Sequence, residues 1–238
     1  DDFLGMAAGL QCLEGWNASS LPVTQTITRL RINYPSTIVG MIEMVSAVVL
    51  AAGRGKNIGE QKALLPLRDE PVLQRVLEGA LASRVREVVC VVSDLASAGQ
   101  HLTIANERLI WLLKYGADGA PNSSMIAGLW AIDPKSDGVL FLAGDQPFIR
   151  SELIDALIER FESGHALIVA PSFQGQPRNP LLFRRELFPD LLKVAGEQSG
   201  RALLEKNRDK AELIPWAEEI PFFDIDVRTD YEHLKEPA

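Results

Sequence analysis

The chain has 238 residues, of which 47% are hydrophobic and 24% are charged. This composition is typical of a folded globular protein and argues against a disordered or fibrous one. Acidic residues outnumber basic residues by 32 to 24, so the formal net charge is −8, and no run of basic residues indicates a nucleic-acid partner. The mostly apolar stretch from Val45 to Ala52 is far shorter than the ~20 residues that cross a bilayer, so we expect no membrane association.

The two cysteines, Cys12 and Cys90, lie too far apart in the sequence to form a CxxC pair or a zinc-ligand pattern. Scarce cysteine fits a reducing compartment, and we expect a cytoplasmic protein. Because residue 1 is aspartate and not methionine, we expect the sequence to be a fragment or a processed product.

Charged residues are sparse in residues 1–44 and become much denser from residue 45 onward. This shift predicts two parts of different origin. We expect residues 1–44 to be an N-terminal extension or the tail of an upstream domain, and residues 45–238 to form the functional domain.

From residue 45 onward, short apolar runs alternate with amphipathic segments, and turns separate them. This pattern predicts an α/β fold, a three-layer sandwich with a mostly parallel sheet of Rossmann-like type. The expected strands are Val45–Leu50, Glu87–Val92, Leu109–Leu113, Gly138–Ala143, Leu167–Ala170 and Pro180–Phe183. One expected helix begins at Pro71. Three others span Ser124–Ile132, Ser151–Ser163 with Ser151 as N-cap, and Ser199–Lys206.

The first strand runs into a loop with glycines at positions 53, 55 and 59, followed by Lys62. Glycines let backbone N–H groups point inward around a phosphate, and a lysine adds a mobile positive charge. The spacing matches neither a P-loop nor a dinucleotide fingerprint. The loop therefore predicts a different polyphosphate site, and the alternative is an ordinary strand-to-helix turn.

Two acidic motifs complete the candidate site. Gly144-Asp145-Gln146-Pro147 follows an apolar strand, at the sheet edge where open α/β sheets bind ligands. Asp224-Ile225-Asp226 would place both carboxylates on one face if extended. Such carboxylates suit a divalent cation; capping a turn or a helix is the alternative for each motif.

Together these motifs resemble the MobA-like nucleotidyltransferase family, most closely its molybdenum cofactor cytidylyltransferase branch. The resemblance covers about residues 45–234 and depends on Leu50-Ala51-Ala52-Gly53 with Gly55, Gly59 and Lys62, on Gly144–Pro147, and on Asp224–Asp226 with Asp230. Ser123-Ser124 is similar to the family's serine-rich segment near the nucleotide base. Alanine at position 52 favours the cytidylyl branch, since the guanylyl branch tends to have glycine there.

The resemblance implies transfer of CMP from CTP to the molybdenum-pterin cofactor, with release of pyrophosphate, during molybdoenzyme maturation. It implies catalytic roles for Lys62 and Asp145, and Mg²⁺ bound by Asp145 and Asp226. The implied nucleotide-binding residues are Leu50, Ala51, Ala52, Gly53, Arg54, Gly55, Lys62, Ser123 and Ser124, and the acceptor-binding residues are Arg178, Asn179 and Arg201. A molybdoenzyme or its chaperone is a further expected partner.

The chain departs from the family pattern in three motifs. Asn57-Ile58 replaces Arg-Met in the first loop, Asn179 replaces a histidine, and Val227-Arg228 replaces Thr-Pro in the last motif. Three alternatives stay open: a guanylyltransferase, a transferase acting on sugar or alditol phosphates, and a cofactor-binding carrier that has lost catalysis.

Overall fold

A computed structural model describes residues 44–53, 62–114, 123–193 and 199–225. The prediction for the N-terminal extension, apart from residue 44, therefore lies outside the described residues. The main strands are β1 (Val45–Leu50), β4 (Val88–Val92), β5 (Leu109–Leu113), β6 (Gly138–Ala143), β7 (Ile168–Phe173), β8 (Gln176–Pro177), β9 (Leu181–Arg184) and β10 (Ala211–Pro215). The helices are α2 (Val72–Ala82), α3 (Leu95–His101), α4 (Ser123–Ala131), α5 (Ser151–Ser163), α6 (Phe188–Leu191) and α7 (Ser199–Lys206).

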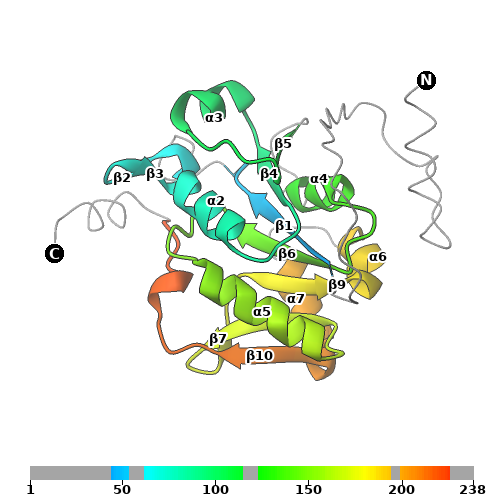
Figure 1. Ribbon diagram of the computed structural model, residues 1–238. Coiled ribbons are helices and arrows are strands. Elements are labelled where there is room, and N and C mark those ends of the chain that lie inside the picture. Colours follow the sequence, from blue (N-terminus) through cyan, green and yellow to red (C-terminus); the bar gives the residue numbers. More distant parts are fainter. Residues whose placement is uncertain (1–43, 54–61, 115–122, 194–198, 226–238) are drawn as a thin grey trace, which may run out of the picture.

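Seven of these strands form one mixed sheet in the order β10-β7-β9-β6-β1-β4-β5 (Figure 1). The short β8 pairs with the last residues of β7. All neighbours are parallel except β9, which runs antiparallel to both β6 and β7, and the short β8. A small separate hairpin joins β2 (Pro66–Leu67) to β3 (Glu70–Pro71). Four 3₁₀ turns complete the described elements: η2 (Lys62–Leu64), η3 (Arg185–Leu187), η4 (Arg208–Lys210) and η5 (Ile220–Phe222).

The sheet is the middle of three layers. One core cluster joins alternate strand residues such as Val49 and Leu142 to α2 and α5, and the other joins Val48 and Phe141 to α4, α6 and α7. Because helices cover both faces, β1 and β6 are almost continuously buried and apolar. The predicted three-layer α/β architecture is therefore confirmed, and Figure 1 shows α2 and α5 on the same side of the sheet.

Several local expectations are corrected by the structure. Arg150, not Ser151, is the N-cap of α5, and no side chain caps that helix; the Ser151 hydroxyl donates to Glu152 instead. Helix α3 was not expected, although the Asp94 carboxylate caps it by accepting from the backbone N–H groups of Ala96 and Ser97. Hydrogen bonding by the Ser97 hydroxyl and N–H lowers the pKa of Asp94.

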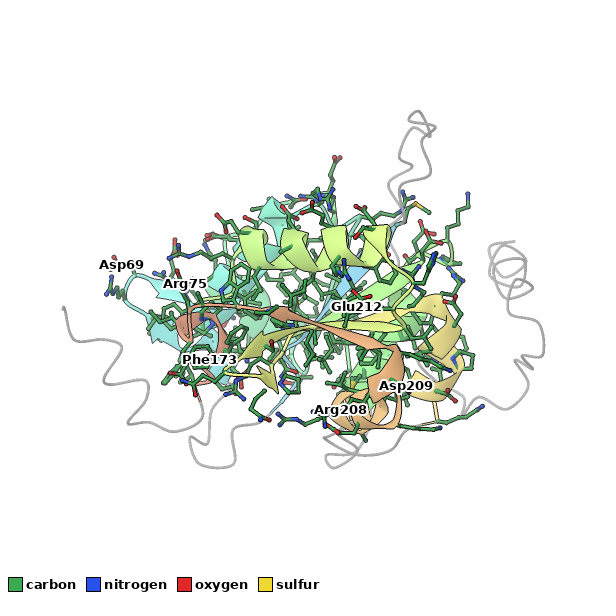
Figure 2. The ribbon with its side chains drawn as sticks, turned by 90° about the horizontal axis from the view of Figure 1, so that it is seen from below. Asp69, Arg75, Phe173, Arg208, Asp209 and Glu212 are labelled. Carbon is green, nitrogen blue, oxygen red and sulfur yellow. The ribbon has the colours of Figure 1, made fainter. Side chains whose placement is uncertain are left out.

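Strand β10 was also not expected, because its residues do not alternate cleanly. It pairs with β7 at the edge of the sheet, and its residues are half-buried or exposed. Arg160 of α5 forms an ion pair with Glu212 of β10, which lies near α5 in Figure 2. Among the described residues, no helix is both long and apolar enough to span a membrane.

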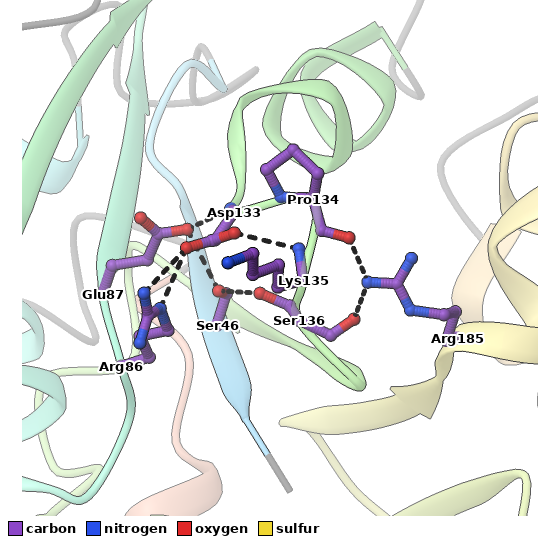
Figure 3. Close-up of polar contacts among 8 residues, drawn as sticks. All are labelled: Ser46, Arg86, Glu87, Asp133, Pro134, Lys135, Ser136 and Arg185. Carbon is purple, nitrogen blue, oxygen red and sulfur yellow. Dashed lines mark hydrogen bonds and ion pairs between the residues drawn. The ribbon is translucent and has the colours of Figure 1, made fainter. Parts of the chain in front are cut away.

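A polar cluster holds the sheet together at the edge where β1 and β6 begin (Figure 3). The buried Ser46 hydroxyl donates to the Glu87 carboxylate at 3.1 Å and lies 2.6 Å from the Ser136 hydroxyl. Glu87 also accepts from the backbone N–H of Asp133, whose carboxylate pairs with Arg86. Since buried polar groups destabilise the fold unless they are paired, this end of the sheet depends on the complete cluster.

We expect Ser46→Ala to lower the free energy of unfolding by about 1–3 kcal/mol, because it removes the hydroxyl that links Glu87 to Ser136. Chemical denaturation monitored by circular dichroism measures the change. Ser163→Ala is the matched control, since that hydroxyl only donates to a carbonyl on the protein surface, and it should shift stability by less than about 0.5 kcal/mol. Equal stability of the two variants would contradict a structural role for the cluster.

Candidate active site

The carboxyl ends of β1 and β6 meet at one edge of the sheet. The backbone N–H of Gly144 donates to the carbonyl of Leu50 at 3.0 Å. A Cβ at position 144 would lie 2.9 Å from that same carbonyl oxygen and 2.9 Å from the Ala51 Cβ. Glycine is therefore required at this position, and the first loop and the Asp145 loop are held in direct contact.

The reversed strand β9 brings a third segment to this edge. Phe141 of β6 pairs with Leu181 of β9 in antiparallel register, so the residues that precede β9 lie where β6 ends. A tight turn between β7 and β8 leads into this segment, and Gln174 and Gly175 both have positive φ there, as a type I′ turn requires. Arg178 and Asn179 are thus delivered to the edge where Asp145 lies.

These segments enclose a cavity of about 580 Å³. Its apolar walls come from β1, α4, β6, β9 and the segment near residue 222, and include Leu50, Met125, Phe141, Leu181, Phe183 and Phe222. Its polar lining consists of Gln146, Arg178, Asn179, Arg201, Glu219 and Asp224. A cavity that combines apolar walls with two arginines and two carboxylates suits an organic ligand that carries a negatively charged group and hydrogen-bond donors.

The last residue of η5 and the segment that follows it lie beside the Asp145 loop. Phe222 and Ile225 are buried, and the backbone N–H of Ile225 donates to the carbonyl of Asp145 at 3.2 Å. The carboxylate-bearing segment that begins at Asp224 is therefore tied directly to Asp145. Asp226 follows Ile225 in the sequence and lies outside the described residues.

Four of the residues proposed from the sequence line one cavity: Leu50, Arg178, Asn179 and Arg201. The remaining described candidates lie around the same sheet edge or start elements near it. Asp145 is half-buried in the loop after β6, Lys62 is the first residue of η2, and Ser123 and Ser124 begin α4. The first-loop residues Ala51, Ala52 and Gly53 follow β1, whereas Arg54 and Gly55 lie outside the described residues.

Oxygen atoms are the available donors for a metal ion at this edge. The Asp145 loop and the Asp224 segment contribute carboxylates, which suit a hard divalent cation such as Mg²⁺. Within the described residues, no group of three His, Cys, Asp or Glu side chains gathers closely enough to hold a metal ion. Cys90 is no candidate, because burial inside β4 raises the pKa of its thiol and keeps it protonated.

Sequence reasoning missed most of the cavity wall. Met125, Phe222 and Phe223 line it, although no role was expected for them. No local signal in the sequence indicated these residues, because the cavity forms only when segments far apart in the chain pack together. Gln146 belongs to the Gly144–Pro147 motif, but the sequence analysis assigned it no role. The structure places it in the cavity lining.

A mostly parallel α/β sheet with a close loop contact and carboxylates at its carboxyl edge defines the class of α/β protein that binds ligands at that edge. The comparison with known families is more specific. Residues 47–211 match the MobA-like NTP transferase domain, so the chain belongs to that family of nucleotidyltransferases.

Relatives with assigned names support the same family. A probable molybdenum cofactor guanylyltransferase of Methanosarcina mazei is 28% identical over 191 residues, which are 77% of this chain and 83% of that protein. Another, from Trichormus variabilis, is 30% identical over 162 residues, which are 66% of this chain and 74% of that protein.

The fold is also found in solved structures. Rv0371c from Mycobacterium tuberculosis H37Rv superposes with a TM-score of 0.71 at 24% identity, covering 82% of this chain and 100% of that one. A structure of that protein in complex with manganese has a TM-score of 0.67 at 23% identity, with coverage of 82% and 99%. This similarity confirms the Rossmann-like fold expected from the sequence.

We expect Gly144→Ala to lower the free energy of unfolding by about 1–3 kcal/mol and to reduce activity, because the new methyl group would press on the backbone of the first loop. Gly99→Ala is the matched control. A Cβ at position 99 meets nothing within 4 Å, and alanine is the better helix former by up to about 1 kcal/mol. Thermal unfolding of both variants measures the difference, and a fully active, stable Gly144→Ala variant would contradict the close loop contact.

Proposed function

We propose that this chain transfers CMP from CTP to the molybdenum-pterin cofactor and releases pyrophosphate. The observation that supports this most is the cavity beside Asp145, since it joins Leu50 of the first loop to Arg178, Asn179 and Arg201. A nucleotidyl transfer needs two bound partners, with the attacking phosphate of the acceptor next to the α-phosphate of the nucleotide. The names of the relatives support the molybdenum cofactor as the acceptor.

In this proposal the residues act mainly by positioning and by neutralising charge. Residues 50–55 hold the nucleotide with Ser123 and Ser124, and Lys62 neutralises the departing pyrophosphate. Arg178 and Arg201 bind the acceptor phosphate, and Asn179 donates a hydrogen bond to it. A phosphate oxygen of the acceptor then forms a bond to the α-phosphorus while the bond from that phosphorus to the bridging oxygen breaks.

Asp145 and Asp226 would hold the divalent cation, which we propose to be Mg²⁺, and the hydrogen bond from Ile225 to Asp145 supports this pairing. When bound, the ion supplies positive charge beside the phosphates. The related Rv0371c was solved with manganese, which is consistent with a divalent metal.

Nucleotide choice is tested by pyrophosphate release from CTP, GTP and ATP, each with Mg²⁺ and the molybdenum-pterin cofactor and each with a control lacking the acceptor. Release from CTP alone, dependent on the acceptor, is the expected result, since Ala52 stands where the guanylyl branch tends to have glycine. GTP is the second candidate, because several relatives are named guanylyltransferases. Acceptor-dependent release from GTP alone would replace CTP in this proposal.

We expect Asp145→Asn to reduce Mg²⁺-dependent turnover by roughly 100-fold or more, since it removes the negative charge that would hold the cation. Its thermal stability should stay close to that of the original chain. Asp209→Asn is the matched control, because Asp209 is exposed on the turn before β10, labelled in Figure 2. β10 is parallel to β7, so this turn lies at the edge opposite Asp145. If the two variants kept the same activity, the metal-binding role of Asp145 would be wrong.

A further inference from the structure

Gln146 is buried at the site without a complete set of hydrogen bonds. It follows Asp145 directly, and its side chain is only 2% exposed. Its Oε1 atom has no hydrogen-bond partner in the part of the chain that the structure describes. A buried amide carbonyl without a partner destabilises a fold, and native proteins rarely keep one without a reason.

The surroundings of Gln146 indicate what the missing partner is. Gln146 lines the 580 Å³ cavity together with Arg178 and Arg201, between apolar walls that include Phe222 and Leu181. The same lining contains the carboxylates of Glu219 and Asp224. A ligand that fits it has an apolar body, a negatively charged group for the arginines, and N–H or O–H donors for the amide oxygen and the carboxylates. Arg178, Asn179 and Arg201, the proposed acceptor-binding residues, line the same cavity as Gln146, so we place Gln146 on the acceptor side.

We propose that Gln146 is an acceptor-binding residue whose Oε1 accepts a hydrogen bond from an N–H group on the heterocyclic ring of the acceptor. The bond fixes the ring so that the phosphate of the acceptor meets Arg178 and Arg201. The identity of the ring rests on the proposed function, whereas the need for a donor rests on the unpartnered oxygen.

The test compares Gln146→Met with the original chain. Methionine keeps the length and the unbranched shape of glutamine but removes the amide. Equilibrium titration with the molybdenum-pterin cofactor, in the absence of any nucleotide, measures acceptor affinity, and a separate titration with CTP and Mg²⁺ measures nucleotide affinity. Thermal unfolding of the unliganded protein is the third measurement, and Gln100→Met, at an exposed position of α3, is the matched control.

We expect Gln146→Met to raise the Kd for the cofactor about tenfold, as loss of one hydrogen bond predicts. The Kd for CTP should not change, and the Tm should be unchanged or higher because an unpaired buried oxygen has been removed. A merely structural glutamine would instead lower the Tm and leave the Kd for the cofactor unchanged. That result would overturn the proposal, as would a loss of CTP affinity in place of cofactor affinity.

Gln146→Asn provides a second variant, because it keeps the amide but withdraws it by one methylene group. It should also lose affinity for the cofactor, and a folded Asn variant with the original affinity would overturn the proposal. If the original chain binds no cofactor, the acceptor assigned to Gln146 is wrong. If it binds the cofactor, with the expected loss in Gln146→Met, but releases no pyrophosphate from any nucleotide, the proposed function fails while the role of Gln146 stands.

Discussion

The site depends on how closely the backbone of one strand end approaches another. Gly144 lies against the Leu50–Ala51 backbone, and a similar contact places Gly128 of α4 so near to Val48 of β1 that a Cβ there would lie 2.3 Å from the Val48 side chain. Small residues at both positions let α4, β1 and β6 pack closely. Because these elements are close, Met125 of α4, Leu50 of β1 and Gln146 of the loop after β6 line a single cavity.

The two edges of the sheet differ in how completely their buried polar groups are hydrogen-bonded. At the edge where β1 and β6 begin, Ser46, Ser136, Glu87 and Asp133 hydrogen-bond to one another, and Arg86 pairs with Asp133 (Figure 3). At the opposite edge the Gln146 oxygen has no partner among the described residues. Proteins commonly give up stability at their functional sites and recover it elsewhere in the fold. Stability and binding are thus separated along the strands.

The sequence predicted the elements whose signals are local. The sequence located β1, β5 and β6 closely, because strands covered on both faces have continuous apolar runs. It also located α2, because a helix buried on one face has apolar residues at helical spacing. Strand β10 was not predicted from the sequence, because an edge strand is only partly buried and lacks that hydrophobic pattern. The lining residues Phe222 and Met125 could not be found this way, because they come together only through long-range packing.

The antiparallel direction of β9 explains how Arg178 and Asn179, the residues proposed to bind the acceptor, reach a site built on a mainly parallel sheet. In a parallel strand only the last residues of the strand and those after it reach the carboxyl edge, as Leu50 does at the end of β1 and Ala51 through Gly53 do after it. In β9 the reversed direction brings the preceding residues, Arg178 and Asn179, to that edge. The loop after β1 and the loop before β9 therefore meet without sharing a strand. A substitution in one of these loops, for example at Asn179, can therefore alter that side of the site while the sheet contacts of the other loop are preserved.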